Sequence, residues 1–310
     1  MGVRRARATG AGVAGALRVQ RAGAQAPGRR LHSRVSTPHE PAATDWRDVH
    51  GPLDIIGDVH GCADELVELL HALGYTVRLE GTGDSRSTVA TTPRARRAFF
   101  VGDLVDRGPN APDVLRIVMD MVERGQALSI VGNHDDKFVR WLKGRDVKIA
   151  HGLERTIAQL DGEGEAIRTR ALAFLDELPS HALLDDGHLA VAHAGIRESM
   201  LGKRFRRAHD FGLYGDSSGR LAADGLPERF NWAAEYRGKT AIVYGHTPVA
   251  EPEWLNNTLC IDTGCVFGGR LTALRWPERE IISVTTKQTY ADLKREFGLP
   301  PPRPPGQAKR

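Results

Sequence analysis

The chain has 310 residues, 41% hydrophobic and 26% charged, which is enough apolar material for one large globular domain or two small ones. The 34 glycines follow no three-residue period and no apolar run is long enough to cross a membrane, so collagen and membrane-spanning proteins are excluded. The cysteines Cys62, Cys260 and Cys265 suit neither a disulfide framework nor a CxxC zinc site. A reducing, cytoplasmic location is therefore expected.

The net charge of +4 comes from the two ends of the chain. The first 48 residues hold nine arginines against three acids, so we expect residues 1–50 to form a flexible Arg/Ala-rich tail. A transit peptide is an alternative, although 35 arginines against 8 lysines in the whole chain are typical of a GC-rich coding bias. Residues 287–310 form a C-terminal segment with a Pro-rich tail. The body, residues 51–286, is mildly acidic and is the expected folded domain.

Six short apolar runs recur along the body, and each is followed directly by Gly, Asp, His or Asn. The runs are residues 53–56, 98–101, 128–131, 189–192, 241–244 and 258–261. Runs of this length beside glycine are typical of buried strands. Residues 66–73 and 114–122 each place apolar side chains on one helix face. Strands alternating with helices predict an α/β fold, in which sites form beyond the carboxyl ends of the strands.

The polar residues that follow these runs are candidate metal ligands. They are Asp58, His60, Asp103, Asn133, His193 and His246. A single Gly-Asp pair after a strand is most often a turn or a helix cap, but the same placement six times over is hard to explain in that way. Oxygen and imidazole donors without a thiolate suit Mn²⁺, Fe, Zn²⁺ or Ni²⁺. Six donors are too many for one ion and fit two, an arrangement that serves phosphoester hydrolysis.

The motifs GDVHG, GDLVDRG, GNHD, AHAG and GHTP, in this order between Leu53 and Val284, resemble the calcineurin-like metallophosphoesterases of the phosphoprotein-phosphatase branch. The resemblance implies an α/β sandwich of two mixed β-sheets flanked by helices, with the active site at the carboxyl ends of the strands. It implies two divalent metal ions, with Mn²⁺ expected and Ni, Fe or Zn as alternatives. The implied ligands are Asp58, His60 and Asp103 for the first ion, and Asp103, Asn133, His193 and His246 for the second.

The resemblance also implies four catalytic residues. Arg107 takes the place of a phosphate clamp, since a guanidinium can donate two parallel hydrogen bonds to phosphoryl oxygens. His134 is the expected general acid, with Asp106 orienting its ring. Asp262 lies in a DTG motif and is either a further functional carboxylate or part of an Asp-Gly turn.

Longer stretches, such as GDVHGCADELVELLHALGY, are similar to the phosphatase domain of the bacterial polynucleotide kinase-phosphatases and to the asymmetric dinucleoside tetraphosphatases. The chain contains no GxxxxGKS or GxxxxGKT phosphate loop, so the kinase of the repair proteins has no counterpart here. The favoured function is a phosphatase of polynucleotide-end or nucleotide phosphates. The alternatives are a dinucleoside tetraphosphate hydrolase, a Ser/Thr protein phosphatase and, more remotely, a non-catalytic metal-dependent binding module.

Phosphorylated nucleic-acid ends or nucleotides are therefore the expected substrates, and neither a membrane nor a stable protein partner is indicated. The candidate substrate-binding residues are Lys203, Arg204, Arg206, Arg207, Tyr214 and Arg237. The four cations at 203–207 surround Phe205 and could bind a polynucleotide backbone while the ring stacks on a base. A solvated helix face explains the same pattern equally well.

Overall fold

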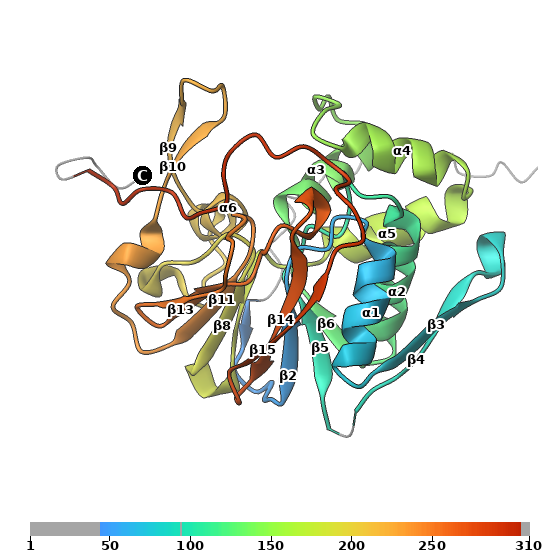
Figure 1. Cartoon of the computed structure of the whole chain (residues 1–310), viewed down its shortest axis with the longest axis horizontal. Coiled ribbons are helices and arrows are strands. Elements are labelled where there is room, and N and C mark those ends of the chain that lie inside the picture. The colour runs from blue at the N-terminus through green and yellow to red at the C-terminus, as the bar shows by residue number, and fades with distance from the viewer. Residues whose placement is uncertain (1–43, 94, 305–310) are drawn as a thin grey trace, which may run out of the picture. The chain divides into compact units, whose positions relative to one another are not determined.

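The computed structural model describes residues 44–93 and 95–304, and two mixed β-sheets form its centre (Figure 1). Sheet A has the strand order β1 (Asp45–Trp46), β7 (His181–Leu184), β8 (Leu189–Ala192), β11 (Ala241–Tyr244), β13 (Thr258–Cys260), β12 (Trp254–Leu255). Sheet B has the order β15 (Glu280–Thr285), β14 (Arg270–Trp276), β2 (Leu53–Ile56), β5 (Arg97–Phe100), β6 (Ala127–Ser129). Within each sheet three strands run parallel: β8, β11 and β13 in sheet A, and β2, β5 and β6 in sheet B. These are the six predicted apolar runs.

The two sheets pack face to face around one apolar layer. Ile55 of β2 and Phe99 of β5 belong to the same fully buried cluster as Val191 of β8 and Val243 of β11. Each large apolar side chain buried in this way contributes roughly 1.5–3 kcal/mol. Both faces of these strands are covered, which explains why their sequences are continuous apolar runs. The predicted sandwich of two mixed sheets flanked by helices is confirmed.

Helices cover the outer faces of both sheets, with α1 and α2 on one side and α6 on the other (Figure 1). The helices are α1 (Ala63–Ala72), α2 (Ala111–Glu123), α3 (Asn133–Leu142), α4 (Leu153–Asp161), α5 (Glu165–Asp176) and α6 (Arg206–Tyr214). The start of α2 is fixed by its N-cap Asn110, whose side chain accepts a hydrogen bond from the Asp113 amide at 3.1 Å. Within the described residues, no helix has the length and apolar character that crossing a membrane requires.

Two hairpins and five short 3₁₀ helices complete the described elements. The hairpins are β3 (Thr76–Glu80) with β4 (Ser87–Thr91), and β9 (Asp216–Leu221) with β10 (Pro227–Phe230). The 3₁₀ helices are η1 (Gly83–Ser85), η2 (Asp185–Gly187), η3 (Glu198–Met200), η4 (Trp232–Glu235) and η5 (Cys265–Phe267).

Both chain ends carry structure that the sequence analysis did not anticipate. Most of the expected tail, residues 1–50, lies outside the described residues, but its last part includes β1, which pairs in parallel with β7. Beyond β15, residues 286–304 form an extended segment without helix or strand, which we call the C-terminal strap. Figure 1 shows the strap as the dark red coil that crosses the ends of the strands. It therefore lies at the edge of the sheets where the polar motifs gather.

Candidate active site

The predicted ligand residues follow the carboxyl ends of parallel strands in both sheets. Asp58 and His60 follow β2, Asp103 follows β5, Asn133 begins α3 after β6, His193 follows β8, and His246 follows β11. His60, Asp103 and His246 have φ angles of 45°, 49° and 71°, in the left-handed region that most side chains avoid. Such backbone strain is concentrated at functional sites.

Glycines next to these residues allow the strand ends to approach closely. A Cβ atom added at Gly102 would lie 2.3 Å from the Gly132 amide nitrogen, and one at Gly245 would lie 1.8 Å from Oδ2 of Asp58. Neither distance is compatible with a side chain at those positions. The glycines of the motifs therefore bring together loops that come from different strands.

The structure brings all six predicted ligand residues into one buried cluster. The two oxygens of Asp103 face opposite halves of it, with Oδ2 3.3 Å from Nε2 of His60 and Oδ1 3.4 Å from Nε2 of His193. His193 Nε2 also lies 3.0 Å from Oδ1 of Asn133 and 3.0 Å from Nδ1 of His246. Asp58 accepts the His246 backbone amide at 3.1 Å, and its Oδ1 lies 3.7 Å from Nδ1 of His193. Asp103 is thus the residue common to both halves.

Hydrogen bonds outside the cluster turn the imidazole lone pairs into it. Nδ1 of His60 donates to the Val105 carbonyl at 2.9 Å, and Nδ1 of His193 donates to the Val101 carbonyl at 3.0 Å. Nε2 of both rings is therefore an acceptor that points inward. His193 Nε2 then faces the Asn133 carbonyl oxygen, so two acceptors lie in contact. A shared cation stabilises such a contact, and these donors fit the divalent ions that the sequence predicts.

Burial shifts the pKa values of the carboxyl and imidazole groups in the cluster. Burial, with Asp262 and Asp103 nearby, raises the pKa of Asp58 well above its usual range, and burial raises the pKa of Asp103 to about 6. Burial also lowers the pKa of His60 and His246 well below the usual value for histidine. Without bound ions, the protein therefore makes the charged forms of these groups less favourable than they are in water. Divalent ions would favour the deprotonated carboxylates and imidazoles instead.

Asp135 of the GNHD motif is a supporting residue that the sequence analysis missed. Its Oδ1 accepts the Leu104 and Val105 amides at 2.9 and 3.3 Å, and its Oδ2 accepts the Gly132 amide at 3.0 Å. The carboxylate thereby joins the loop after β5 to the start of α3. Its place directly after His134 was the available signal.

The predicted catalytic residues lie at one side of the cluster. Nδ1 of His134 lies 2.6 Å from Oδ2 of Asp106, whose Oδ1 accepts the Thr156 hydroxyl at 2.8 Å. Nη1 and Nη2 of Arg107 lie 2.5 and 2.7 Å from Nε2 of His60 and of His134. Burial raises the pKa of Asp106 to about 8 and lowers that of His134. The contact between Nδ1 and Asp106 holds the His134 ring, so its Nε2 faces the cluster.

Asp262 forms the turn that was one of the two roles left open by the sequence, and it also lines the cavity. Its Oδ1 accepts the Gly264 amide at 3.0 Å, which is the bond of a turn. The same side chain is buried and lines the cavity next to His246. Burial raises its pKa to about 7, with Asp103 as a smaller cause.

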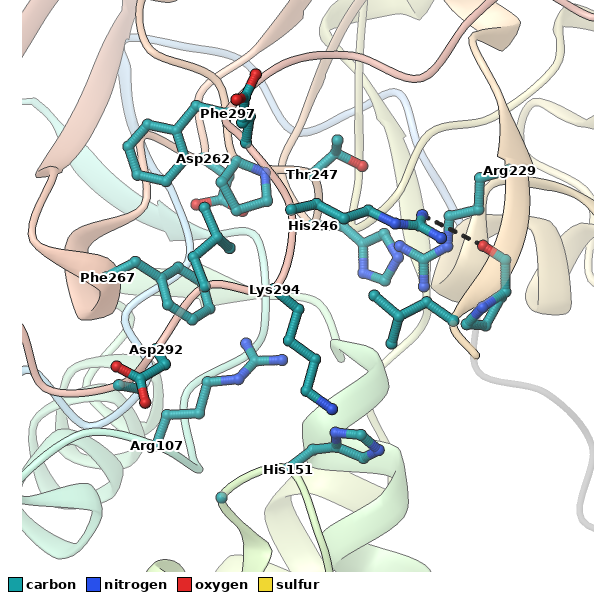
Figure 2. Close-up of a pocket in the computed structure, with 18 of the residues that line it drawn as sticks. Arg107, His151, Arg229, His246, Thr247, Asp262, Phe267, Asp292, Lys294 and Phe297 are labelled. Carbon is teal, nitrogen blue, oxygen red and sulfur yellow. Dashed lines mark hydrogen bonds between the residues drawn. The ribbon is translucent and has the colours of Figure 1, made fainter. Parts of the chain in front are cut away.

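A cavity of about 1040 Å³ opens onto the cluster, with Arg107, His246 and Asp262 among its lining residues (Figure 2). The strap forms much of its wall. Arg229 of β10 also lines it, and its guanidinium makes no hydrogen bond or ion pair with the described residues. Burial, with Arg295 and Arg107 as smaller causes, lowers the pKa of Arg229 to about 10. Its sequence context, a polar hairpin, gave no signal of this position.

The predicted substrate-binding residues are mostly distant from this cavity. Lys203, Arg204, Arg206 and Arg207 are exposed at the start of α6, on the outer side of sheet A. Arg237 is exposed and donates to the Ala234 and Tyr236 carbonyls at 2.9 and 2.6 Å. Tyr214 differs, since it lines a small cavity of about 20 Å³ that also contacts His246 and Arg229.

Comparison with known proteins agrees with this geometry. The family model described as calcineurin-like phosphoesterase matches residues 51–278. The asymmetrical bis(5′-nucleosyl)-tetraphosphatase PrpE of Anoxybacillus flavithermus is 47% identical over 245 residues, which cover 78% of this chain and 97% of that protein. The PrpE protein of Bacillus subtilis is 44% identical with the same coverage.

A crystal structure of a protein proposed to be a diadenosine tetraphosphatase superposes with a TM-score of 0.56 at 23% identity, and covers 79% of this chain and 98% of that chain. At this identity it supports the fold alone. Together with the match over 51–278, these results establish that the chain belongs to the calcineurin-like phosphoesterases, hydrolases that act on phosphoesters with two divalent metal ions.

Proposed function

We propose that this chain is an asymmetrical bis(5′-nucleosyl)-tetraphosphate hydrolase, which cleaves its substrate into a nucleoside triphosphate and a nucleoside monophosphate. The observation that carries the proposal is the 44–47% identity to proteins of that name over 97% of their length. A cavity of about 1040 Å³ in front of the cluster supports it, because ligand sites of about 300–1,000 Å³ hold whole drug-sized molecules.

This proposal takes up the alternative of the sequence analysis rather than its leading substrate. The comparisons favour the dinucleoside tetraphosphate over a polynucleotide end. The basic residues at 203–207, expected to meet a polynucleotide, lie on the outer side of sheet A, away from the cavity. A non-catalytic binding module is disfavoured by the contacts among His134, Asp106 and Arg107.

We propose that Asp58, His60 and Asp103 hold one divalent ion and that Asp103, Asn133, His193 and His246 hold the other. Donor atoms of Asp103, His193 and His246 lie within 4.8 Å of one another, as do those of Asp103, His60 and His134, which supports this assignment. Asn133 Oδ1 lies 3.0 Å from Nε2 of His193, and Asp58 accepts the His246 amide. Mn²⁺ is the proposed ion, and Ni, Fe or Zn would suit the same donors. When bound, the pair of ions would neutralise phosphoryl charge and increase the acidity of a water molecule.

The chain's own residues supply binding and proton transfer. In this proposal Arg107 and Arg229 donate hydrogen bonds to the phosphoryl oxygens at the entrance to the cluster. Water adds its oxygen to phosphorus and releases a proton to solvent, while the bond from phosphorus to the leaving phosphate oxygen breaks. His134 is the proposed donor of a proton to that oxygen from Nε2, which in the present structure accepts from Nη2 of Arg107 at 2.7 Å, and Asp106 holds the ring at Nδ1. Asp262 lies beside the reacting groups and adds a further carboxylate.

Two further assignments of the sequence analysis stand as proposals. Residues 51–286 are the proposed metallophosphoesterase domain, supported by the family match over 51–278. A cytoplasmic location is supported by the three cysteines, which are all free and buried.

The proposed function is tested with three substrates in the presence of Mn²⁺, Ni²⁺, Zn²⁺ or Mg²⁺. The substrates are diadenosine tetraphosphate, an end-phosphorylated oligonucleotide and a phosphopeptide, with Asp103→Ala as the inactive control. The highest kcat/KM is expected for the tetraphosphate, with equal amounts of triphosphate and monophosphate by chromatography. Faster release of phosphate from the oligonucleotide would instead favour polynucleotide ends as the substrate.

A further inference from the structure

Side chains of the fold anchor the strap on both sides of the stretch that lines the cavity. Near its start, Oε1 of the buried Glu65 accepts the Tyr290 hydroxyl at 2.8 Å and the Lys287 amide at 3.1 Å. Near its end, Arg303 is buried over the Phe230 ring at 4.1 Å and donates to Asp216 at 2.5 Å. The residues between these anchors are held next to the cluster.

Three cations of the cavity wall have different surroundings. Arg295 of the strap is held by Asp224 through two hydrogen bonds of 2.6 and 2.9 Å. Lys294 and Lys148 are exposed in the wall, and neither makes an ion pair or hydrogen bond within residues 44–93 and 95–304. Two lysines thus bring positive charge to the cavity that no acid of the described chain neutralises by contact.

These lysines and Arg107 surround one side of the cavity. Figure 2 shows Lys294 reaching down from the strap between Arg107 and His151. Burial lowers the pKa of His151, and the charges of Lys294, Arg107 and Lys148 are among the smaller causes. Three cations thus act on this part of the cavity, which the acids Glu154 and Asp292 also line. The half-buried Phe267 and Phe297 also line the cavity (Figure 2), and Cζ of Arg107 lies 5.2 Å from the centre of the Phe267 ring.

A dinucleoside tetraphosphate needs such an extension, because it carries charge on each of its four phosphates. In the proposed function, the metal ions, Arg107 and Arg229 act on the phosphate under attack. The remaining phosphates must extend into the cavity and are stabilised there by nearby cations. The phenylalanine side offers a flat apolar surface to a nucleobase.

We propose that Lys294 of the strap, with Lys148, binds the polyphosphate of the leaving nucleotide and so makes the site selective for long polyphosphate chains over simple phosphomonoesters. This inference rests on the proposed function. A phosphomonoester carries no further phosphate and ends before it reaches these lysines. The strap is then a substrate-binding element.

The experiment compares Lys294→Ala and Lys148→Ala with the wild-type protein on diadenosine tetraphosphate and on p-nitrophenyl phosphate. Each variant should raise KM for the tetraphosphate about tenfold, since a hydrogen bond to a charged group is worth about that factor in affinity. kcat for the tetraphosphate and kcat/KM for p-nitrophenyl phosphate should stay within about twofold. Lys294→Arg should restore most of the affinity. KM should also rise less steeply with salt in Lys294→Ala than in the wild-type protein.

Lys287→Ala is the matched control, because Lys287 lies on the same strap but pairs with Asp64 at 3.0 Å, outside the cavity. It should leave both substrates unaffected. An unchanged tetraphosphate KM in Lys294→Ala, or an equal loss on both substrates, would overturn the inference while leaving the proposed function intact. A wild-type protein that hydrolyses p-nitrophenyl phosphate but not the tetraphosphate would refute the proposed function, and the polyphosphate subsite with it.

Discussion

The contact between His134 and Asp106 predicts that the enzyme needs its acid only for basic leaving groups. Replacing His134 by Ala removes the proton donor and leaves the ligand residues in place. Replacing Asp106 by Asn keeps the shape of the side chain but removes the carboxyl oxygen that lies 2.6 Å from Nδ1 and holds the ring. Both variants should slow the release of a basic alkoxide far more than that of a weakly basic group.

The size of each effect follows from the geometry. General acid catalysis contributes about 10²- to 10⁴-fold, so His134→Ala should lower kcat by that order for an alkyl phosphate. The 2.6 Å contact between Nδ1 and Oδ2 is buried, and a hydrogen bond to a charged group is worth about 1.5–3 kcal/mol. Asp106→Asn should therefore lower the same rate roughly 10- to 150-fold.

The tetraphosphate should respond differently, because its leaving group is itself a phosphate. A phosphate has a second pKa of about 6 and leaves without needing a proton at neutral pH. We expect losses below about tenfold for diadenosine tetraphosphate and p-nitrophenyl phosphate in both variants.

The assay measures kcat on a series of aryl and alkyl phosphates of increasing leaving-group basicity, with the tetraphosphate alongside. The variants should show a steeper fall in rate with basicity than the wild-type protein. Thr156→Val is a graded control, because it removes only the hydroxyl that donates to Asp106. Parallel slopes, with one constant loss for every substrate, would refute the assignment of His134 as the acid.

Three further predictions concern the metals, the pH dependence of stability and the strap. The Asp103→Ala variant should lose both its bound metal and its turnover, which elemental analysis and hydrolysis rates will test. A variant that keeps both would contradict the proposed bridging role. Burial, with a smaller contribution from His209, lowers the pKa of His181 to about 4, below its unfolded value of about 6.5. The unfolded chain therefore binds the proton first, and His181 by itself should lower the unfolding free energy by about 3 kcal/mol as the pH falls from 6.5 to 4. Urea titrations at both pH values should show a smaller loss in His181→Leu, and an equal loss would argue against the buried neutral ring. Arg303→Ala should lower the free energy of unfolding by about 2 kcal/mol, because it removes a buried cation from Asp216. The variant should also make the strap more sensitive to protease. An unchanged Tm would show that the strap is held by other contacts.

The strands and the ligand cluster were predictable because their signals are local. Each apolar run and the polar residue after it lie within a few positions of each other, and the carboxyl ends of parallel strands meet at the same edge of a sheet. Residues 53–56, 189–192 and 241–244 are strands with the predicted bounds. The six predicted ligand side chains meet for the same reason.

The cavity wall was not predictable because it is assembled by tertiary contacts. Arg229 lies in a polar hairpin, and only the packing of that hairpin beside sheet A brings its guanidinium to His246. The strap has no periodic pattern, so its Pro-rich sequence indicated only an exit from the fold. Its anchors, such as Glu65 with Tyr290, join residues far apart in the chain. The cluster at 203–207 illustrates the opposite error, in which a local charge pattern suggested a surface that is distant from the cavity.

The position of β14 has a consequence for synthesis of the protein. This strand, Arg270–Trp276, pairs with β2 near the other end of the chain, and its Thr272 carbonyl accepts the Gly57 amide at 2.9 Å just before Asp58. A nascent chain therefore leaves the ribosome with one edge of β2 unpaired until nearly the whole body has been translated. Contacts of such long sequence separation form late and slowly. The backbone hydrogen bond that holds Gly57 at the start of the GDVHG loop can therefore form only after Thr272 has been translated.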